Sequence, residues 1–194
     1  MKKIILLFIT LFAFSSIKAQ DSKAYLGVSV GYAIPLGDGY ENVNSGINLG
    51  FINFGYRFSK KWGATLNLTS SGFSYKNSAY GSAVGIAAFS VGPMYTASLG
   101  KKLSLDLKPQ YAFRVAGVQK DIPIQNMMYD ATYKGTGFVL GSSLNFGVSK
   151  GFKLSLNLDY ASFNFTEVEV AGTTLSVSTS ANQLVLGAGL RYNF

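Results

Sequence analysis

Apolar residues alternate with small or polar residues along most of this sequence, and this period of two constrains the fold more than any other feature. The pattern is clearest from Leu103 to Ala116, where Leu, Pro, Tyr, Phe and Val alternate with Ser, Asp, Lys, Gln, Ala and Arg. It recurs from Gln183 to Phe194, with Leu, Ala, Tyr and Phe on one face. Because successive side chains of a strand point to opposite faces, the pattern predicts β-strands. The expected fold class is therefore all-β.

The predicted strands and the lengths of their connections indicate the topology. Eight runs alternate in this way: residues 24–34, 47–58, 62–75, 83–99, 103–116, 136–148, 152–165 and 183–194. The connections are alternately long and short, with short turns at residues 59–61, 100–102 and 149–151. This asymmetry is typical of an outer-membrane barrel, with short periplasmic turns and longer external loops. We expect an eight-stranded antiparallel up-and-down transmembrane β-barrel, with a β-bulge near Phe51 and Ile52 and an irregularity at Pro93.

Composition supports a membrane protein that has no membrane helix. Mean hydropathy is +0.23 and only 13% of residues are charged, whereas a soluble domain has about 25%. No segment approaches the run of about 18 apolar residues that a spanning helix needs. The apolar residues are therefore spread by alternation rather than gathered in segments.

The kinds of side chain on each face indicate which face meets lipid. Gly, Ser, Ala, Asn and Thr dominate the polar face, which suits a narrow lumen, whereas soluble exteriors favour Lys and Glu. Aromatic residues fall near both ends of the predicted strands, as in the two aromatic belts of a membrane barrel. We expect the apolar face outside. The alternative is a secreted soluble β-barrel with its apolar face inside.

The first residues have the pattern of a cleaved secretory signal peptide. Lys2 and Lys3 precede an apolar run from Ile4 to Phe14, and small residues follow up to Ala19. The run has 11 residues, which as a helix cover only about half of a ~30 Å hydrocarbon core. We predict a signal peptide at residues 1–19 and a barrel domain at residues 20–194.

The last alternating apolar positions, Leu190, Tyr192 and Phe194, resemble the C-terminal assembly signal of bacterial outer-membrane β-barrels. With the strand pattern, the chain resembles the OmpA and OmpX type of outer-membrane β-barrel domain, a porin-like family. This resemblance implies recognition by the barrel-assembly machinery, contact with outer-membrane lipid and a monomeric state. It also implies the outer membrane of a diderm bacterium, with both termini of the mature chain in the periplasm.

Charged residues on the polar face are the candidate functional residues. Alternation places seven of them in the lumen: Arg57, Asp106, Lys108, Arg114, Lys153, Asp159 and Arg191. Charges in a narrow lumen must pair or stay hydrated. One interpretation is a salt-bridge network that plugs the barrel. The other is a small porin-like channel, whose five basic groups and two aspartates would favour anions.

Other function classes lack the residues they need. The sequence has no His and no Cys, which removes the usual general base, the thiol nucleophile and the common zinc ligands. We expect no enzyme activity, no cofactor and no metal site. The net charge of +8 includes three lysines of the predicted signal peptide and several in turns, so it does not indicate nucleic-acid binding.

The function expected from these observations is non-enzymatic. The chain is predicted to be an integral outer-membrane barrel with a structural and surface-interaction role. Aromatic and methionine residues in the predicted loops are candidates for contact with an external ligand of unknown identity: Tyr40, Tyr80, Met127, Met128 and Tyr129.

Overall fold

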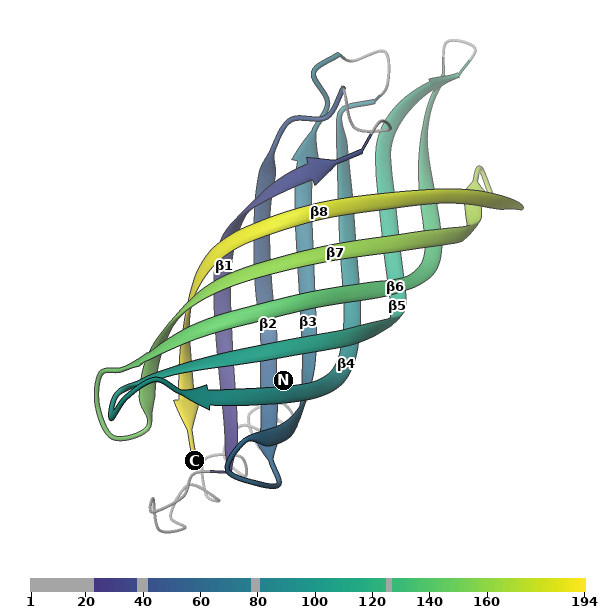
Figure 1. Ribbon diagram of the computed structural model, residues 1–194. Helices are drawn as coiled ribbons and strands as arrows, with labels where there is room; N and C mark the ends of the chain where they lie inside the picture. The colour runs from purple at the N-terminus through teal and green to yellow at the C-terminus, as the bar shows by residue number, and fades with distance from the viewer. Residues whose placement is uncertain (1–22, 38–41, 78–80, 125–126) are drawn as a thin grey trace, which may run out of the picture.

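The computed structural model describes residues 23–37, 42–77, 81–124 and 127–194, and these form one closed antiparallel barrel. The predicted signal peptide lies outside the described residues. Figure 1 shows the strands; their bounds are β1 Ala24–Leu36, β2 Gly46–Arg57, β3 Trp62–Ser74, β4 Ala83–Ser98, β5 Leu103–Ile124, β6 Met127–Gly147, β7 Phe152–Val170 and β8 Thr173–Asn193. The predicted fold class of eight antiparallel up-and-down strands is confirmed.

The first and last strands close the ring. β1 and β8 pair without a register shift from Tyr25↔Asn193 to Leu36↔Asn182. At the end of this seam, Ala24 and Phe194 exchange two backbone hydrogen bonds, at 3.2 and 2.9 Å. We call this end of the barrel, where the turns at residues 58–61, 99–102 and 148–151 also lie, the short-turn end. The opposite end is called the hairpin end.

Alternation determines which side chains face outward. On β7, Leu154, Leu156 and Leu158 expose 52%, 56% and 45% of their surface, whereas the intervening Ser155 and Asn157 expose 6% and 7%. The large apolar side chains therefore cover the outer wall, and small or polar side chains fill the lumen. This arrangement is opposite to that of a soluble barrel, whose apolar face would point inward.

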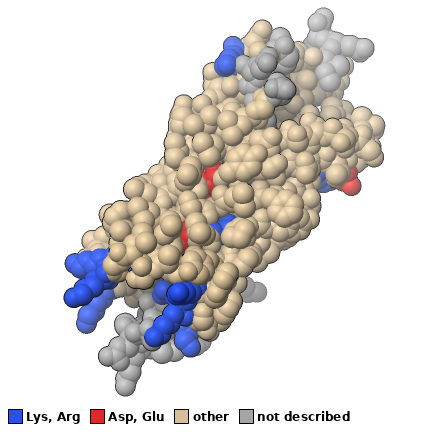
Figure 2. All heavy atoms as spheres, viewed as in Figure 1, with Lys and Arg blue, Asp and Glu red and all other residues tan. Residues whose placement is uncertain are grey.

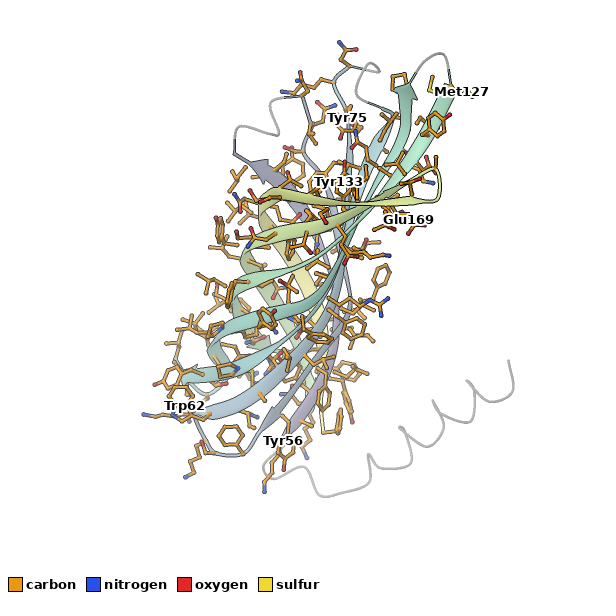
Figure 3. The ribbon with its side chains drawn as sticks, turned by 90° about the vertical axis from the view of Figure 1, so that its right-hand side faces the viewer. Tyr56, Trp62, Tyr75, Met127, Tyr133 and Glu169 are labelled. Atoms are coloured by element: carbon orange, nitrogen blue, oxygen red, sulfur yellow. The ribbon has the colours of Figure 1, made fainter. Side chains whose placement is uncertain are left out.

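Aromatic side chains gather near the short-turn end, as the sequence predicts. Figure 3 shows Tyr56 and Trp62 there, with Tyr75 and Tyr133 at the hairpin end. The ring of Trp62 packs edge-on against Tyr95, with centroids 5.1 Å apart. The rings of Phe152 on β7 and Tyr192 on β8 also pack together, with centroids 4.8 Å apart. Rings at this level are placed as interfacial side chains of a membrane barrel are.

Four strands run farther than the alternating runs of the sequence. Residues 119–135 were expected to be a loop, but they continue β5 and β6 as a hairpin that ends in the pair Ile124↔Met127. Residues 167–180 were expected to be either a loop or an extension of the hairpin, and they continue β7 and β8 up to the pair Val170↔Thr173. Figure 1 shows the β5–β6 tip at the top of the barrel and the β7–β8 tip projecting to the right. Pairing overrides the loop-like composition, because each extended strand satisfies its backbone groups against a neighbour.

Two of the expected irregularities are present. The registers of β2 with β3 shift between Gly50 and Ile52, which confirms the bulge predicted near Phe51 and Ile52. Along β4 and β5, described pairs stop at Val91↔Tyr111 and resume at Tyr95↔Leu107. The constant register places Pro93 opposite Pro109 in this interval, and neither proline has an N–H to donate.

A third irregularity, in β5, was not expected. Ala112 pairs with Gly137 but Val115 pairs with Gly135, so β5 carries an extra residue here. The bulge reverses the phase of alternation. As a result Phe113 and Arg114 both point outward, and Val115 turns into the lumen with 1% exposure. The prediction that Arg114 faces the lumen was wrong for this reason.

Candidate functional site

A buried ion pair crosses the lumen near the short-turn end. Asp106 of β5 is fully buried, and Arg191 of β8 is 5% exposed. Nη1 of Arg191 lies 2.5 Å from Oδ2 of Asp106. The carboxylate also accepts hydrogen bonds from Oγ1 of Thr96 at 2.7 Å and from Nδ2 of Asn145 at 3.0 Å. Three donors thus offset the cost of removing this charge from water.

The guanidinium of Arg191 is held on its other sides as well. Its Nε donates to Oδ1 of Asn193 at 3.0 Å. Its plane lies over the ring of Tyr25, 4.0 Å from the centroid, in a cation–π contact. The Tyr25 hydroxyl in turn lies 3.5 Å from Sδ of Met94, which is fully buried. Side chains from β1, β4, β5, β6 and β8 therefore fill this end of the lumen.

The middle of the lumen contains a second polar layer. Lys108 is 2% exposed, and its Nζ donates to Oγ of Ser143 at 2.7 Å. That hydroxyl donates onward to Oδ1 of Asn157, also at 2.7 Å. Across the same layer, Nδ2 of Asn67 donates to Oε1 of Gln110 at 3.0 Å. These bonds join β3, β5, β6 and β7 through the interior.

Asp159 faces Lys108 across a glycine. The registers place Lys108, Gly141 and Asp159 side by side on β5, β6 and β7. A Cβ on Gly141 would lie 2.7 Å from Oδ1 of Asp159 and 3.5 Å from Cε of Lys108. The missing side chain at this position is therefore what makes room for the two charged groups above the β6 backbone.

Toward the hairpin end the lumen becomes apolar. Buried residues from most strands form one hydrophobic cluster there, which includes Phe73, Val115, Phe163, Phe165 and Val185. Phe163 and Val115 are each 1% exposed. Side chains of this size in the interior of an eight-stranded barrel pack against one another rather than line a channel.

The remaining candidates lie around this filled lumen. Lys153 is half-buried and faces Arg191 across the β7–β8 ladder. Its ammonium interacts electrostatically with Arg191, Arg57 and Asp106. Arg57, at the end of β2, is also half-buried. The structure thus brings together Asp106, Arg191, Lys153 and Arg57 near the short-turn end, and Lys108 with Asp159 in the middle, while Arg114 lies on the outer wall.

The neutral partners of these charges were not predicted from the sequence. Tyr25, Thr96 and Asn145 each contact one member of the ion pair. Tyr25 and Asn145 occupy positions that alternate with the outward apolar residues of their strands, so alternation predicts that their side chains point inward. It does not predict which charge each contacts, because that depends on the three-dimensional packing of the strands.

Neither a helical membrane span nor a group of metal ligands occurs in the part of the chain that the structure describes. In that part of the chain, no helix is long and apolar enough to cross a membrane. Within the same residues, His, Cys, Asp and Glu do not gather in groups of three or more.

Comparison with known families decides which group of proteins the chain belongs to. Residues 4–194 match the family described as the outer membrane protein beta-barrel domain. The chain belongs to this family. The match covers nearly the whole sequence, so the outer membrane is where this β-barrel domain resides. No curated protein sequence matches the chain.

Solved structures show the same fold as this outer-membrane barrel. One is the crystal structure of Ail, the attachment invasion locus protein of Yersinia pestis. Its TM-score is 0.54 at 17% identity, over 89% of this chain and 100% of that chain. Another is Neisserial surface protein A, with a TM-score of 0.54 at 14% identity, over 88% of this chain and 97% of that chain. At these identities the likeness concerns the fold alone.

The C-terminal residues of the barrel occupy the closing strand. Leu190 and Tyr192 pair with Val28 and Leu26 of β1, and Phe194 bonds to Ala24. Leu190 exposes 45% of its surface to the outside. The rings of Tyr192 and Phe194 stack with centroids 6.3 Å apart. The three residues of the predicted assembly signal therefore form one outward ridge at the short-turn end.

At its hairpin end the barrel presents the extended β5–β6 hairpin. Met127 and Met128 at its tip expose 57% and 68% of their surface; Tyr40 and Tyr80 lie outside the described residues. Lys120 and Asp130 form an exposed ion pair across the hairpin. Their hydrogen bond holds the pKa of Asp130 below its ordinary value of 3.8 and raises the pKa of Lys120 above 10.5.

Proposed function

We propose that this protein is a non-enzymatic outer-membrane barrel that supports the envelope and presents its hairpin end to the outside. In this proposal the short turns and both termini are periplasmic, and the mature monomer begins at residue 20 after signal-peptide cleavage. The barrel-assembly machinery reads Leu190, Tyr192 and Phe194. The observation that carries the proposal is the filled lumen, which leaves the two ends and the outer wall as the surfaces available for function.

The alternative of a small porin-like channel is disfavoured by the same observation. An ion would have to pass the Asp106–Arg191 pair at one level and the cluster around Phe163 and Phe165 at another. The first level has its carboxylate already bonded to three donors. The second level is apolar and repels water.

An uncovered strand edge supports a surface-interaction role. Among the described residues, β8 pairs with β1 only as far as Asn182, so Thr173–Ala181 has a partner only on the β7 side. This stretch of nine residues contains no charged residue and no proline. Natural edge strands usually carry such residues to prevent pairing. An extended segment of another protein would find free backbone donors and acceptors here.

Relatives of the same fold give the proposal a context. Ail is named as an attachment invasion locus protein and NspA as a surface protein. A surface role for the present chain rests on its own hairpin end, because the likeness to these proteins extends only to the fold.

The topology can be tested by labelling introduced cysteines, since the chain has no Cys of its own. Thr174→Cys lies near the β7–β8 tip, and Lys101→Cys lies in a short turn. In intact cells a membrane-impermeant maleimide should label Thr174→Cys but not Lys101→Cys. After the outer membrane is permeabilised, both should react. The reverse pattern would contradict the proposed orientation, and equal labelling in a detergent-free soluble fraction would contradict a membrane barrel.

A further inference from the structure

A groove crosses the lipid-facing wall of the barrel over several strands. It has a volume of about 740 Å³. The registers align most of its lining as two rows that run across the strands instead of along them, and the remaining two lining residues, Lys108 and Gly141, lie between these rows. The first row, from β3 to β7, consists of Trp62, Tyr95, Leu107, Ser142 and Leu158.

The second row lies closer to the hairpin end. It runs from β4 to β8 and consists of Pro93, Pro109, Leu140, Tyr160 and Leu184. We call the space between and over these two rows the transverse groove. Its position on the outer wall means that the hydrocarbon of the bilayer, and not water, is in contact with it.

Two local features make the wall concave here. Ser142 is small and stands between Leu107 and Leu158 in the first row, so the row dips at its centre. Its hydroxyl donates to the carbonyl of Leu158 at 3.1 Å, which satisfies the polar group within the wall. In the second row, Pro93 and Pro109 face each other where the β4–β5 ladder is interrupted. A mobile lipid annulus requires neither feature.

The length of the groove fits one acyl chain. Strands are spaced about 4.8 Å apart, so a row across the four intervals from β4 to β8 spans roughly 19 Å. Strands of a membrane barrel tilt by about 35–45°, which leaves a rise of roughly 11 to 14 Å along the membrane normal. One leaflet of a ~30 Å hydrocarbon core is about 15 Å thick. A chain lying in the groove would therefore stay within a single leaflet.

Positive charge lies at the end of the groove that begins with Trp62. Lys60 and Lys61 directly precede Trp62. The carbonyl of Lys61 accepts a hydrogen bond from the Thr96 amide at 2.7 Å, which fixes this turn against β4. Lys101 and Lys102 lie in the next short turn, and the turns contain no carboxylate. Figure 2 shows Lys and Arg gathered at this lower end, with no Asp or Glu visible beside them.

We propose that the transverse groove is a binding site for one anionic glycerophospholipid. An acyl chain lies along the two rows, and the phosphate of the headgroup binds at the Lys60–Lys61 turn beside Trp62. Given the orientation put forward under Proposed function, this lipid belongs to the periplasmic leaflet. Lysines at a membrane surface attract anionic headgroups, and an interfacial Trp is placed at the level of those headgroups.

The acyl part of the site can be tested on the refolded barrel by native mass spectrometry. The probe is dioleoyl phosphatidylglycerol, with dioleoyl phosphatidylcholine as the zwitterionic comparison. The unaltered chain should retain a single phosphatidylglycerol. Ser142→Trp should lose it, because the indole fills the groove. The matched control is Leu49→Trp on β2, an outward position 41% exposed on another part of the wall; it should retain the lipid.

If Ser142→Trp fails to fold, Leu158→Trp blocks the same row and replaces it. Equal retention by the groove variant and Leu49→Trp would overturn the proposal, as would the absence of any retained lipid. Preferential retention of lipid A over phosphatidylglycerol would also overturn it, since lipid A belongs to the opposite leaflet.

The headgroup part is tested by Lys60→Gln with Lys61→Gln. Each lost lysine should weaken phosphatidylglycerol binding by about fivefold, while phosphatidylcholine binding stays unchanged. Lys150→Gln, in another short turn, is the control and should leave both unchanged. If Lys150→Gln has the same effect as the pair, the attraction is general and the site at Trp62 is contradicted. Because retention is measured on purified barrel, its failure is distinct from a reversed orientation, which only cysteine labelling detects.

Discussion

At the scale of single residues, the burial of Asp106 is the most demanding feature of the lumen. A carboxylate removed from water loses several kcal/mol of solvation, which only close donors can offset. Asp106 has three such donors, contributed by β4, β6 and β8. Its charge is therefore compatible with the interior only when all of these strands are in register.

Replacing this carboxylate by its amide tests the ion pair. Asp106→Asn keeps the shape of the side chain but leaves the buried guanidinium of Arg191 without a counterion. We expect a loss of about 3–5 kcal/mol in the free energy of unfolding. Urea unfolding of the barrel in phospholipid vesicles measures it.

Thr96→Val is the matched control for that experiment. It removes one neutral donor to the same carboxylate and should cost only about 1–3 kcal/mol. If the two variants cost the same, the charge of Asp106 contributes nothing beyond its hydrogen bonds.

The ion pair at the β5–β6 tip gives a pH-dependent prediction. Asp130 has a pKa below 3.8 because Lys120 and the Asp121 amide bond to its ionised form. The folded pKa is depressed, so the stabilisation is present above pH 3.8 and is lost as the pH falls through the lower folded value.

An NMR titration of the Asp130 carboxyl carbon should therefore show a midpoint below 3.8 in the unaltered chain. In Lys120→Gln, the midpoint should move up toward 3.8. An unchanged midpoint in the variant would show that Lys120 does not hold this carboxylate.

Strand parity predicted the orientation of most lumen residues but not their partners. Asp106, Lys108 and Arg191 lie inside, where alternation placed them. The pairing of Asp106 with Arg191 joins positions separated by 85 residues. The periodicity of the sequence does not predict this pairing, since the pairing depends on how many strands lie between Asp106 and Arg191 and on how those strands are staggered.

At the scale of strands, the element count and most boundaries followed from alternation and turn residues. The strand β7, for example, begins at Phe152 as expected. Alternation did not predict the positions at which its own phase reverses. The bulge near Ala112 has no turn residue to mark it, and it sends Arg114 outward. Bulges of this kind are set by the fit of neighbouring strands, which a single sequence does not display.

Truncation of the closing strand should impair assembly, whereas shortening of a hairpin tip should not. A chain ending at Tyr192 loses the Phe194 bonds to Ala24 and the outward ring at the short-turn end. We expect strongly reduced insertion into the outer membrane, measured as the fraction of protein with heat-modifiable mobility in outer-membrane fractions.

The comparison is a chain in which residues 168–175 are replaced by an Asn-Gly turn. Glu167 and Ser176 already pair, so a two-residue turn can connect them. This variant should insert normally. Normal insertion of the chain ending at Tyr192 would count against a role for Phe194 in assembly.

At the scale of the whole molecule, the barrel is a solid wall around a layered interior. A charged layer lies at the short-turn end, a polar layer in the middle and an apolar layer toward the hairpin end. The sequence identified the wall because lipid imposes strict alternation on it. The layering was less visible, since a narrow lumen accepts any small or well-paired side chain.

Conductance follows from this layering. In planar bilayers the refolded barrel should show no steady single-channel current. Asp106→Ala opens the charged layer but leaves the Phe163 layer in place, so it should also be silent. Asp106→Ala combined with Phe163→Ala opens both of these layers and leaves only the polar layer around Lys108, so the double variant should conduct. A conducting unaltered chain would instead favour the porin-like alternative.

The ion pair across the lumen also bears on how the ring is joined. A strand that slips by one residue at the β1–β8 seam exchanges its two faces. Arg191 would then point outward near the short-turn end, where an Arg on the lipid face costs about 0–1 kcal/mol, and the larger penalty would come from Asp106, which would remain buried without its cation. The last strand therefore favours correct closure of the barrel, because the native alignment of the β1–β8 seam is the one that lets Arg191, near the end of the chain, reach Asp106 in the middle of it.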